Sequence, residues 1–87
     1  MDVIGRRVEP REDQELHLQP GEYGKDTRDG SWHARPPGTE LVANLGKHQV
    51  TEHEDGTITV SPSIKISQFS IGTWHGFLEC GVWRRKA

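Results

Sequence analysis

The stretch DGTITVSPSIKIS, residues 55–67, decides the fold. From Ile58 to Ile66 its even-numbered positions are apolar, whereas its odd-numbered positions carry hydroxyl or ammonium groups. Side chains alternate between the two faces of a β-strand, so the stretch predicts a strand with one face on a core and the other toward water or a ligand. Pro62 has no N–H group for a strand ladder, so the strand lies at a sheet edge or has a bulge there. The residues expected to face the core are Ile58, Val60, Ile64 and Ile66, and those expected to face outward are Thr57, Thr59, Ser61 and Ser63.

A turn at Gly56 predicts that a second strand precedes this one. A three-residue loop that ends at Gly56 pairs Val50 with Val60, so that two apolar residues share a face. A two-residue turn shifts the register by one residue and moves every side chain to the other face. The three-residue loop is therefore predicted, and it places His53 on the polar face and His48 on the core face.

The segment WHGFLECGVW, residues 74–83, predicts a second hairpin. A three-residue loop in it pairs Leu78 with Val82 and Phe77 with Trp83, which gives an aromatic contact across the two strands. This hairpin and the first one are expected to form one antiparallel unit.

The other segments carry weaker patterns. Residues 15–19 (ELHLQ) and 31–35 (SWHAR) each predict a short strand, and residues 40–45 allow one helical turn. Residues 1–14 are polar and are expected to form a flexible arm or an edge strand, followed by a single β domain over residues 15–87. With the two hairpins, the chain is expected to be mainly β: a small antiparallel sandwich or partly open barrel of about five or six short strands, with little or no helix.

The composition excludes several classes of protein. The 87 residues suffice for one domain at most, and 11 basic against 13 acidic residues give a net charge of −2. A general nucleic-acid binder carries a basic stripe, and here the basic residues cluster only in Arg84-Arg85-Lys86. The apolar runs are short, the N-terminus lacks the apolar stretch of a signal peptide, and Cys80 has no cysteine to pair with. We therefore expect a cytoplasmic protein without a disulfide, a membrane partner or general affinity for nucleic acid.

Tryptophan and arginine residues indicate a site for an anionic ligand. Flat rings stack on nucleobases, and guanidinium groups bind phosphate through two parallel hydrogen bonds. Three tryptophans exceed what a core with two phenylalanines needs, although each of them could also serve in the core. The hydroxyl-rich outward face of residues 57–63 adds hydrogen-bonding groups. The predicted ligand-binding residues are Trp32, Arg35, Ser61, Ser63, Trp74, His75, Arg84 and Arg85.

Histidine and cysteine side chains offer a weaker alternative. His48, His53, His75 and Cys80 are ligand types that zinc accepts, but their spacing does not match the common zinc motifs. The predicted register also turns His48 and His53 to opposite faces. Cys80 near His75 could act as a nucleophile with its base. We expect neither an enzyme nor a protein with a cofactor or a metal.

Three strings, HxVTEHEDGTITVSPSI (residues 48–64), WHGFL (74–78) and GVW (81–83), follow PGEYG (20–24) and PPG (36–38) along the chain. This pattern, which covers most of residues 20–84, resembles a group of small proteins of unknown function from bacteriophages, notably those of actinobacteria, and from mobile bacterial elements. More distant bacterial relatives carry a cysteine-rich segment upstream of the SPSI element, which this chain lacks. The resemblance implies a phage origin and a β fold, and it brings no activity with it.

The leading hypothesis is a non-enzymatic phage accessory protein that acts against host defences. It would sequester a small anionic ligand, such as a host immune signalling nucleotide, in the cytoplasm of the infected bacterium, and it could do so as a homo-oligomer. One alternative is a protein-binding module that inhibits a host protein or scaffolds a phage complex through an exposed edge strand near Pro62. The other is a small metal-binding protein or hydrolase.

Overall fold

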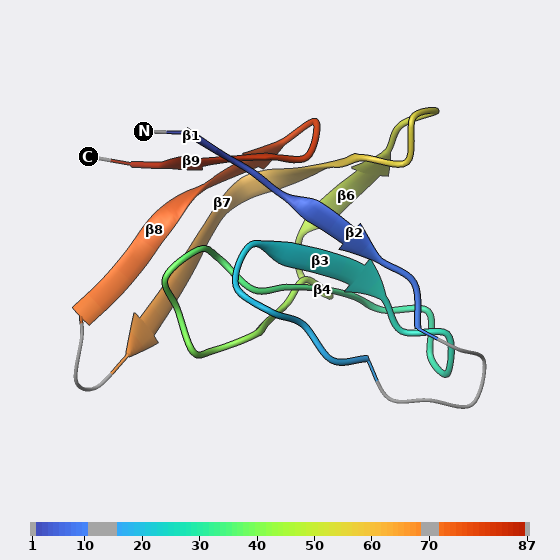
Figure 1. Cartoon of the computed structure of the whole chain (residues 1–87), viewed down its shortest axis with the longest axis horizontal. Coiled ribbons are helices and arrows are strands. Elements are labelled where there is room, and N and C mark those ends of the chain that lie inside the picture. The colour runs from blue at the N-terminus through green and yellow to red at the C-terminus, as the bar shows by residue number, and fades with distance from the viewer. Residues whose placement is uncertain (1, 11–15, 69–71, 87) are drawn as a thin grey trace.

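The computed structural model describes residues 2–10, 16–68 and 72–86. These residues form nine β-strands in two sheets and no helix, which confirms the prediction of a mainly β fold (Figure 1). The five-stranded sheet contains, in spatial order, β1 (Asp2–Ile4), β9 (Val82–Arg85), β8 (Gly72–Glu79), β7 (Ile58–Gln68) and β6 (Gln49–Glu52). The four-stranded sheet contains β2 (Arg6–Val8), β3 (Glu22–Lys25), β4 (Trp32–Ala34) and β5 (Ala43–Asn44). Neighbouring strands are antiparallel except for the parallel pair β2 and β3. The described part of the chain has no helix that could cross a membrane.

Strand β7 follows the alternation of residues 55–67. Its buried residues are Ile58, Val60, Ile64 and Ile66, none more than 8% exposed. The pairing of β6 with β7 sets Val50 opposite Val60, as the three-residue loop predicts, and Gly56 has a φ of 88°. β7 lies between β6 and β8 rather than at an edge, and its pairing with β8 shifts between Val60 and Ile64. Of the two explanations offered for Pro62, the bulge is therefore the one that holds.

Strands β8 and β9 are joined by a two-residue turn, so the predicted three-residue loop is wrong. Cys80 and Gly81 have φ values of 48° and 75°, the backbone of a two-residue hairpin turn. This register pairs Leu78 with Trp83, and both are buried. A shift of one residue exchanges the faces, so Phe77 is 36% exposed and the predicted contact between Phe77 and Trp83 does not form.

The first half of the chain departs further from the prediction. Residues 16–19 form no strand, and Glu15 lies outside the described residues. The segment EYGK forms β3, in which Tyr23 is 2% exposed, and residues 43–44 form β5 where a helical turn was considered. β4 lies within the predicted strand over residues 31–35. The described residues form more strands than the five or six expected from the sequence. The additional strands are only two to four residues long, too short to show an alternation of apolar and polar residues, and are recognised only by their pairing with other strands.

Residues 2–8 contribute an edge strand to each sheet. β1 pairs with β9 and β2 pairs with β3, and Gly5 lies between them. The N–H group of Gly5 donates a hydrogen bond of 2.7 Å to the carbonyl oxygen of Gly81. The edge-strand alternative for the N-terminal arm thus describes residues 2–8, whereas residues 11–14 lie outside the described residues.

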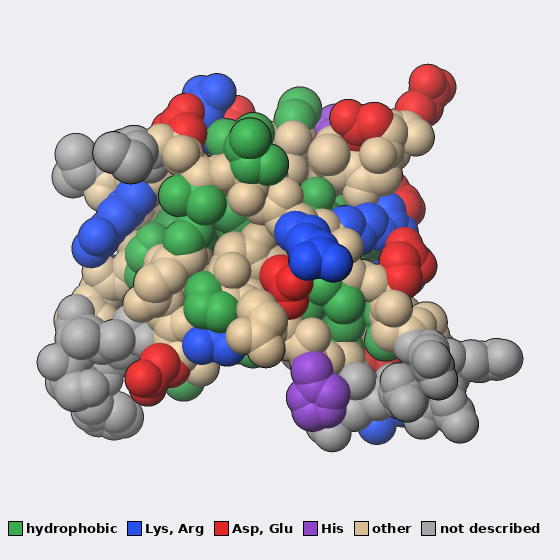
Figure 2. Space-filling view, viewed as in Figure 1, with side chains coloured by type: hydrophobic (Ala, Val, Ile, Leu, Met, Phe, Trp, Pro, Cys, Tyr) green, Lys and Arg blue, Asp and Glu red, His purple; other side chains and the backbone are tan. Residues whose placement is uncertain are grey.

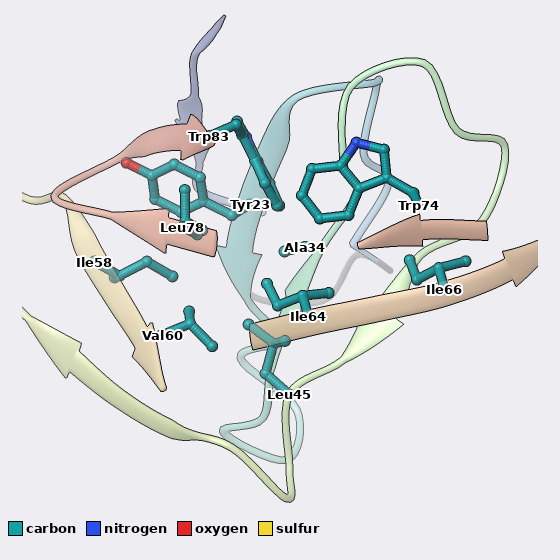
Figure 3. Close-up of a cluster of buried hydrophobic side chains, with 10 residues drawn as sticks. All are labelled: Tyr23, Ala34, Leu45, Ile58, Val60, Ile64, Ile66, Trp74, Leu78 and Trp83. Carbon is teal, nitrogen blue, oxygen red and sulfur yellow. The ribbon is translucent and has the colours of Figure 1, made fainter. Parts of the chain in front are cut away.

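The core lies between the two sheets and takes most of its side chains from β7, β8 and β9 (Figure 3). The four-stranded sheet contributes Tyr23 and Ala34. Burial raises the pKa of the Tyr23 hydroxyl, because a phenolate would be poorly solvated there. Trp83, 1% exposed, donates a hydrogen bond of 2.9 Å from Nε1 to the carbonyl oxygen of Gly21, just before β3. Trp83 therefore connects the two sheets by packing and by a buried hydrogen bond.

Candidate functional site

A cavity of about 400 Å³ lies where β1, β8 and β9 meet the loop between β4 and β5. Its size is within the range of small-molecule pockets, about 300–1,000 Å³. The space-filling view shows hydrophobic side chains gathered over β7, β8 and β9, next to a basic side chain (Figure 2). The residues that line the cavity are Val3, Pro37, Gly38, Trp74, Trp83 and Arg85.

Gly76 makes room for one wall of the cavity. It lies opposite Arg85 in the pairing of β8 with β9. A Cβ atom at Gly76 would come within 2.7 Å of Cη2 of Trp74 and still closer to the carbonyl oxygen of Arg84. A larger residue would push either the Trp74 ring or β9 away, so the wall depends on a position without a side chain.

The two indole rings in the wall differ in their hydrogen bonding. Trp74 and Trp83 meet edge to face, with ring centroids 5.5 Å apart and an interplanar angle of 85°. Nε1 of Trp83 is bonded to Gly21, as described above. Nε1 of Trp74 has no hydrogen-bond partner in the described part of the chain, although this residue is only 6% exposed. Figure 3 shows this nitrogen on the edge of the ring that is turned away from Ile64 and Ile66.

Among the described residues that line the cavity, Arg85 is the only charged one. Its side chain is exposed and forms no ion pair with any residue that the structure describes. Its neighbour Arg84 points to the opposite face of β9, where Nε lies 3.6 Å from Oδ2 of Asp2. The free guanidinium of Arg85 can therefore bind a phosphate or carboxylate through two hydrogen bonds.

Two of the predicted ligand residues have structural roles in the four-stranded sheet. The ring of Trp32 contacts two cations: the guanidinium of Arg7 lies 5.2 Å from the ring centroid and the ammonium of Lys25 lies 5.9 Å from it. Arg35 donates hydrogen bonds to the carbonyl oxygens of Thr39, at 2.8 Å, and Leu18, at 3.0 Å. Neither residue lines the cavity. The side chain of Trp32 packs against two cationic groups, and that of Arg35 is bonded to the backbone of two loops.

The other predicted residues divide between the two faces of the five-stranded sheet. Trp74 and Arg85 line the cavity, whereas His75 and Ser63 lie on the outer face, with Nε2 of His75 2.7 Å from Oγ of Ser63. Ser61 is exposed. Trp74 and His75 are consecutive residues of β8 and not part of a loop, so they face opposite sides. The eight predicted residues therefore do not form one site.

The four alternative metal ligands are not brought together. His48 places Nε2 3.1 Å from the carbonyl oxygen of Ser63, and His75 bonds to the hydroxyl of the same serine. Among the described residues, no three His, Cys, Asp or Glu side chains are grouped closely enough to hold a metal ion. Only His53 and Cys80 are neighbours, with Nε2 3.8 Å from Sγ.

The outer face of the five-stranded sheet brings Cys80 next to His53, a pair that the sequence did not predict. The sequence pattern suggested His75 as the partner of Cys80, but the turns of the two hairpins lie close together and bring His53 there instead. Thr59 bridges the pair, since its Oγ1 lies 2.7 Å from Nε2 of His53 and accepts a hydrogen bond of 2.9 Å from the N–H of Cys80. The sheet thus brings an exposed thiol within 3.8 Å of an imidazole, with the hydroxyl of Thr59 in contact with both residues.

Arg7 is a further residue that the sequence did not single out. Its Nη1 donates to Oε2 of Glu52 at 2.6 Å and to the carbonyl oxygen of Gly56 at 2.9 Å, and its Nε lies 2.8 Å from Oε1 of Glu9. The hydrogen bond to Glu52 is the main reason that the pKa of Arg7 is raised. Arg7 thus fastens β2 to the hairpin of β6 and β7. No signal in the sequence places these distant segments together.

Comparisons of this chain with protein-family models, with curated proteins and with solved structures found no match. The candidate site is therefore described by its own geometry: a cavity whose described lining contains two indoles, one free guanidinium and the loop residues Pro37 and Gly38.

Proposed function

We propose that this protein binds a small anionic ligand, such as a host immune signalling nucleotide, in the cavity of Trp74, Trp83 and Arg85, and does not transform it. The observation that carries the proposal is the free guanidinium of Arg85 beside an aromatic wall. A ring system can pack against the indoles while an attached phosphate or carboxylate meets Arg85. These are the features of a pocket that is mainly apolar and has a few orienting polar groups.

The absence of a reactive group in the lining supports binding without catalysis. Of the lining residues that the structure describes, none has a nucleophilic side chain or a group that titrates near neutral pH. Binding without turnover removes a signal only if the protein is present in amounts comparable to the ligand. The proposal therefore places the protein in the cytoplasm of an infected bacterium, as a phage product that lowers the concentration of a defence signal, and it includes assembly into a homo-oligomer.

Calorimetry on the purified chain tests this proposal. Titration with cyclic mononucleotides, cyclic dinucleotides and ADP-ribose derivatives should give saturable heat for at least one of them, and chromatography should recover that ligand unchanged. Arg85→Gln should weaken binding at least tenfold, whereas Arg84→Gln, which alters the adjacent residue on the other face, should not. Absence of heat with every compound, or equal losses in the two variants, would contradict the proposal.

A second candidate function is binding to a protein. Leu41 and Val42 are 45% and 48% exposed directly before β5, an edge strand of the four-stranded sheet. A partner strand could pair with β5 and cover these two side chains. The strand that contains Pro62, β7, is paired on both sides and is not an edge strand. The sheet edge nearest to Pro62 is its neighbour β6. Hydrogen exchange in host extract should then protect the amides of β5, and Leu41→Lys should abolish that protection; unchanged exchange would count against it.

A further inference from the structure

The unpartnered indole N–H of Trp74 narrows the chemistry of the ligand, and the following inference rests on the proposed function. A tryptophan as deeply buried as Trp74 normally has a hydrogen-bond partner for its N–H group. Trp83 illustrates the rule, because its Nε1 donates to the carbonyl oxygen of Gly21 at 2.9 Å. Trp74 differs from Trp83: it is 6% exposed as a residue and lines the cavity, and its Nε1 has no partner in the described part of the chain. Because this nitrogen is not fully enclosed by protein atoms, a molecule that enters from outside can accept its hydrogen bond.

The charge of the cavity lining indicates how many anionic groups the ligand carries. Arg85 is the single charged residue of its described lining, and one guanidinium group matches one phosphate or one carboxylate. A triphosphate would place further negative charge in a cavity whose other lining residues are apolar or neutral. The site is therefore matched to a ligand with one anionic group.

The size of the cavity limits the ring system. At about 400 Å³ it lies near the lower end of the range for ligand pockets, which favours one nucleotide over two. Its lining includes both the indole of Trp74 and the residues Pro37 and Gly38 of the loop between β4 and β5. A ligand with a single ring system is therefore the better match in size.

We infer that the cavity recognises a ligand of mononucleotide size by two groups: one phosphate or carboxylate bound by Arg85, and one hydrogen-bond acceptor on the edge of a flat ring bound by Nε1 of Trp74. A nucleobase provides such acceptors as ring nitrogens and carbonyl oxygens. The two contacts together distinguish this ligand from a bare anion, which lacks the ring, and from a nucleoside, which lacks the charge.

Titrations with compounds of graded size test the inference. The probes are 3′,5′-cyclic AMP and 3′,5′-cyclic GMP, AMP, adenosine, inorganic phosphate, nicotinic acid as a ring carboxylate, ATP and a cyclic dinucleotide. At least one ligand with one ring system and one phosphate or carboxylate should bind at least tenfold more tightly than adenosine, phosphate, ATP and the dinucleotide. Binding by the phosphates or by nicotinic acid then distinguishes the two kinds of anion.

A measurement on the unaltered protein tests the role of Trp74 directly. With ¹⁵N-labelled indoles, the N–H resonance of Trp74 should shift downfield on saturation with the tightest probe and should be protected from solvent exchange, whereas that of Trp83 should change little. Trp74→Phe keeps a ring but removes the N–H group, and it should weaken binding by about tenfold, the effect of one lost hydrogen bond. The melting temperature of this variant shows whether it is folded.

The outcomes separate the two levels of the proposal. If a dinucleotide or ATP binds as tightly as any ligand with one anionic group, or if the Trp74 resonance stays unchanged at saturation, the inference is overturned while the proposed function stands. If no probe binds, both are overturned. A downfield shift of Trp74 together with preference for a ligand with one ring system and one charge supports both.

Discussion

The indole of Trp83 donates its N–H group to the carbonyl oxygen of Gly21, so that a side chain of the five-stranded sheet is bonded to the chain that enters the four-stranded sheet. The adjacent indole of Trp74 has no such bond in the described part of the chain. The two rings are in contact and similarly buried. They differ mainly in what their nitrogen atoms do, and this difference separates a structural residue from a candidate ligand contact.

This contrast predicts unequal effects on stability. Trp83→Phe should lower the free energy of unfolding by about 0.5–1.5 kcal/mol through its lost hydrogen bond, because the carbonyl of Gly21 then keeps only the bond of 3.1 Å from the N–H group of Arg6. Trp74→Phe, the matched control, breaks no hydrogen bond within the described chain and should cost less. Urea unfolding of both variants without ligand measures the difference. Equal losses would mean that the hydrogen bond to Gly21 contributes nothing.

The turn between β8 and β9 predicts a stabilising substitution. Cys80 has a φ of 48°, which a residue with a Cβ atom adopts at a cost and which asparagine tolerates better. Cys80→Asn should raise the free energy of unfolding by about 0.5–1 kcal/mol, whereas the β-branched Cys80→Val should lower it. Thermal melting of the two variants tests this, and a higher melting temperature for Cys80→Val would refute it.

The link from Arg7 to the hairpin of β6 and β7 should be worth more than an exposed ion pair. Arg7→Met removes the exposed hydrogen bond to Glu52 and the partly buried one to the carbonyl of Gly56, and together these should cost about 1–2 kcal/mol. Arg84→Gln, which removes an exposed pair with Asp2, should cost about 1 kcal/mol or less. A double-mutant cycle with Glu52→Gln isolates the coupling of Arg7 with Glu52. A coupling near zero would show that Glu52 contributes nothing and that the effect comes from the other contacts of Arg7, with Gly56, Glu9 and Trp32.

The thiol of Cys80 should depend on His53 for its reactivity. His53→Gln should slow alkylation by iodoacetamide at neutral pH several-fold, because Nε2 of His53 is the nearest group that can accept the thiol proton. His75→Gln provides the control, since His75 bonds to Ser63 instead. Mass spectrometry of the alkylated protein gives the rates. If only the His75 variant reacted more slowly, His75 would be the partner of Cys80, as the sequence suggested.

Asp26 should contribute to the loss of folding stability at low pH. Hydrogen bonds from the side chain and backbone of Arg28 lower the pKa of Asp26 in the folded protein. A carboxyl group with a lower pKa in the folded state contributes stability above its unfolded pKa, and that contribution is lost as the pH falls through the folded pKa. The free energy of unfolding should therefore decrease from pH 7 to pH 3, and less steeply in Asp26→Asn. Parallel pH profiles of the two proteins would contradict this.

The sequence predicted the β7 hairpin because its signals are local. Alternation from Ile58 to Ile66 and a glycine at the turn suffice to define both register and faces. The second hairpin failed on one point, since Glu79-Cys80-Gly81 reads as a three-residue loop unless Cys80 is known to adopt a positive φ. A single residue in an unexpected conformation exchanged the faces of Phe77 and Leu78.

The candidate site was only partly predictable, because it depends on pairings between distant segments. Trp74 and Arg85 were named for their chemistry, but only the register of β8 with β9 places them on the same side. Trp32 and Arg35 have the same side-chain types, but Trp32 packs against Arg7 and Arg35 is hydrogen-bonded to the backbone of Thr39. Residue type indicates what a side chain can bind, whereas the fold decides whether it is free to do so.

Strand β1 pairs with β9, so Val3 and Arg85 wall the same cavity from opposite ends of the described chain. The lining on this side of the cavity therefore forms only when two strands far apart in the sequence are paired with each other. A chain cleaved just before β9 would keep nine of the ten residues of the core cluster but would lose Trp83 and Arg85 from the lining together. A cut at this one place would thus alter the cavity far more than the composition of the core.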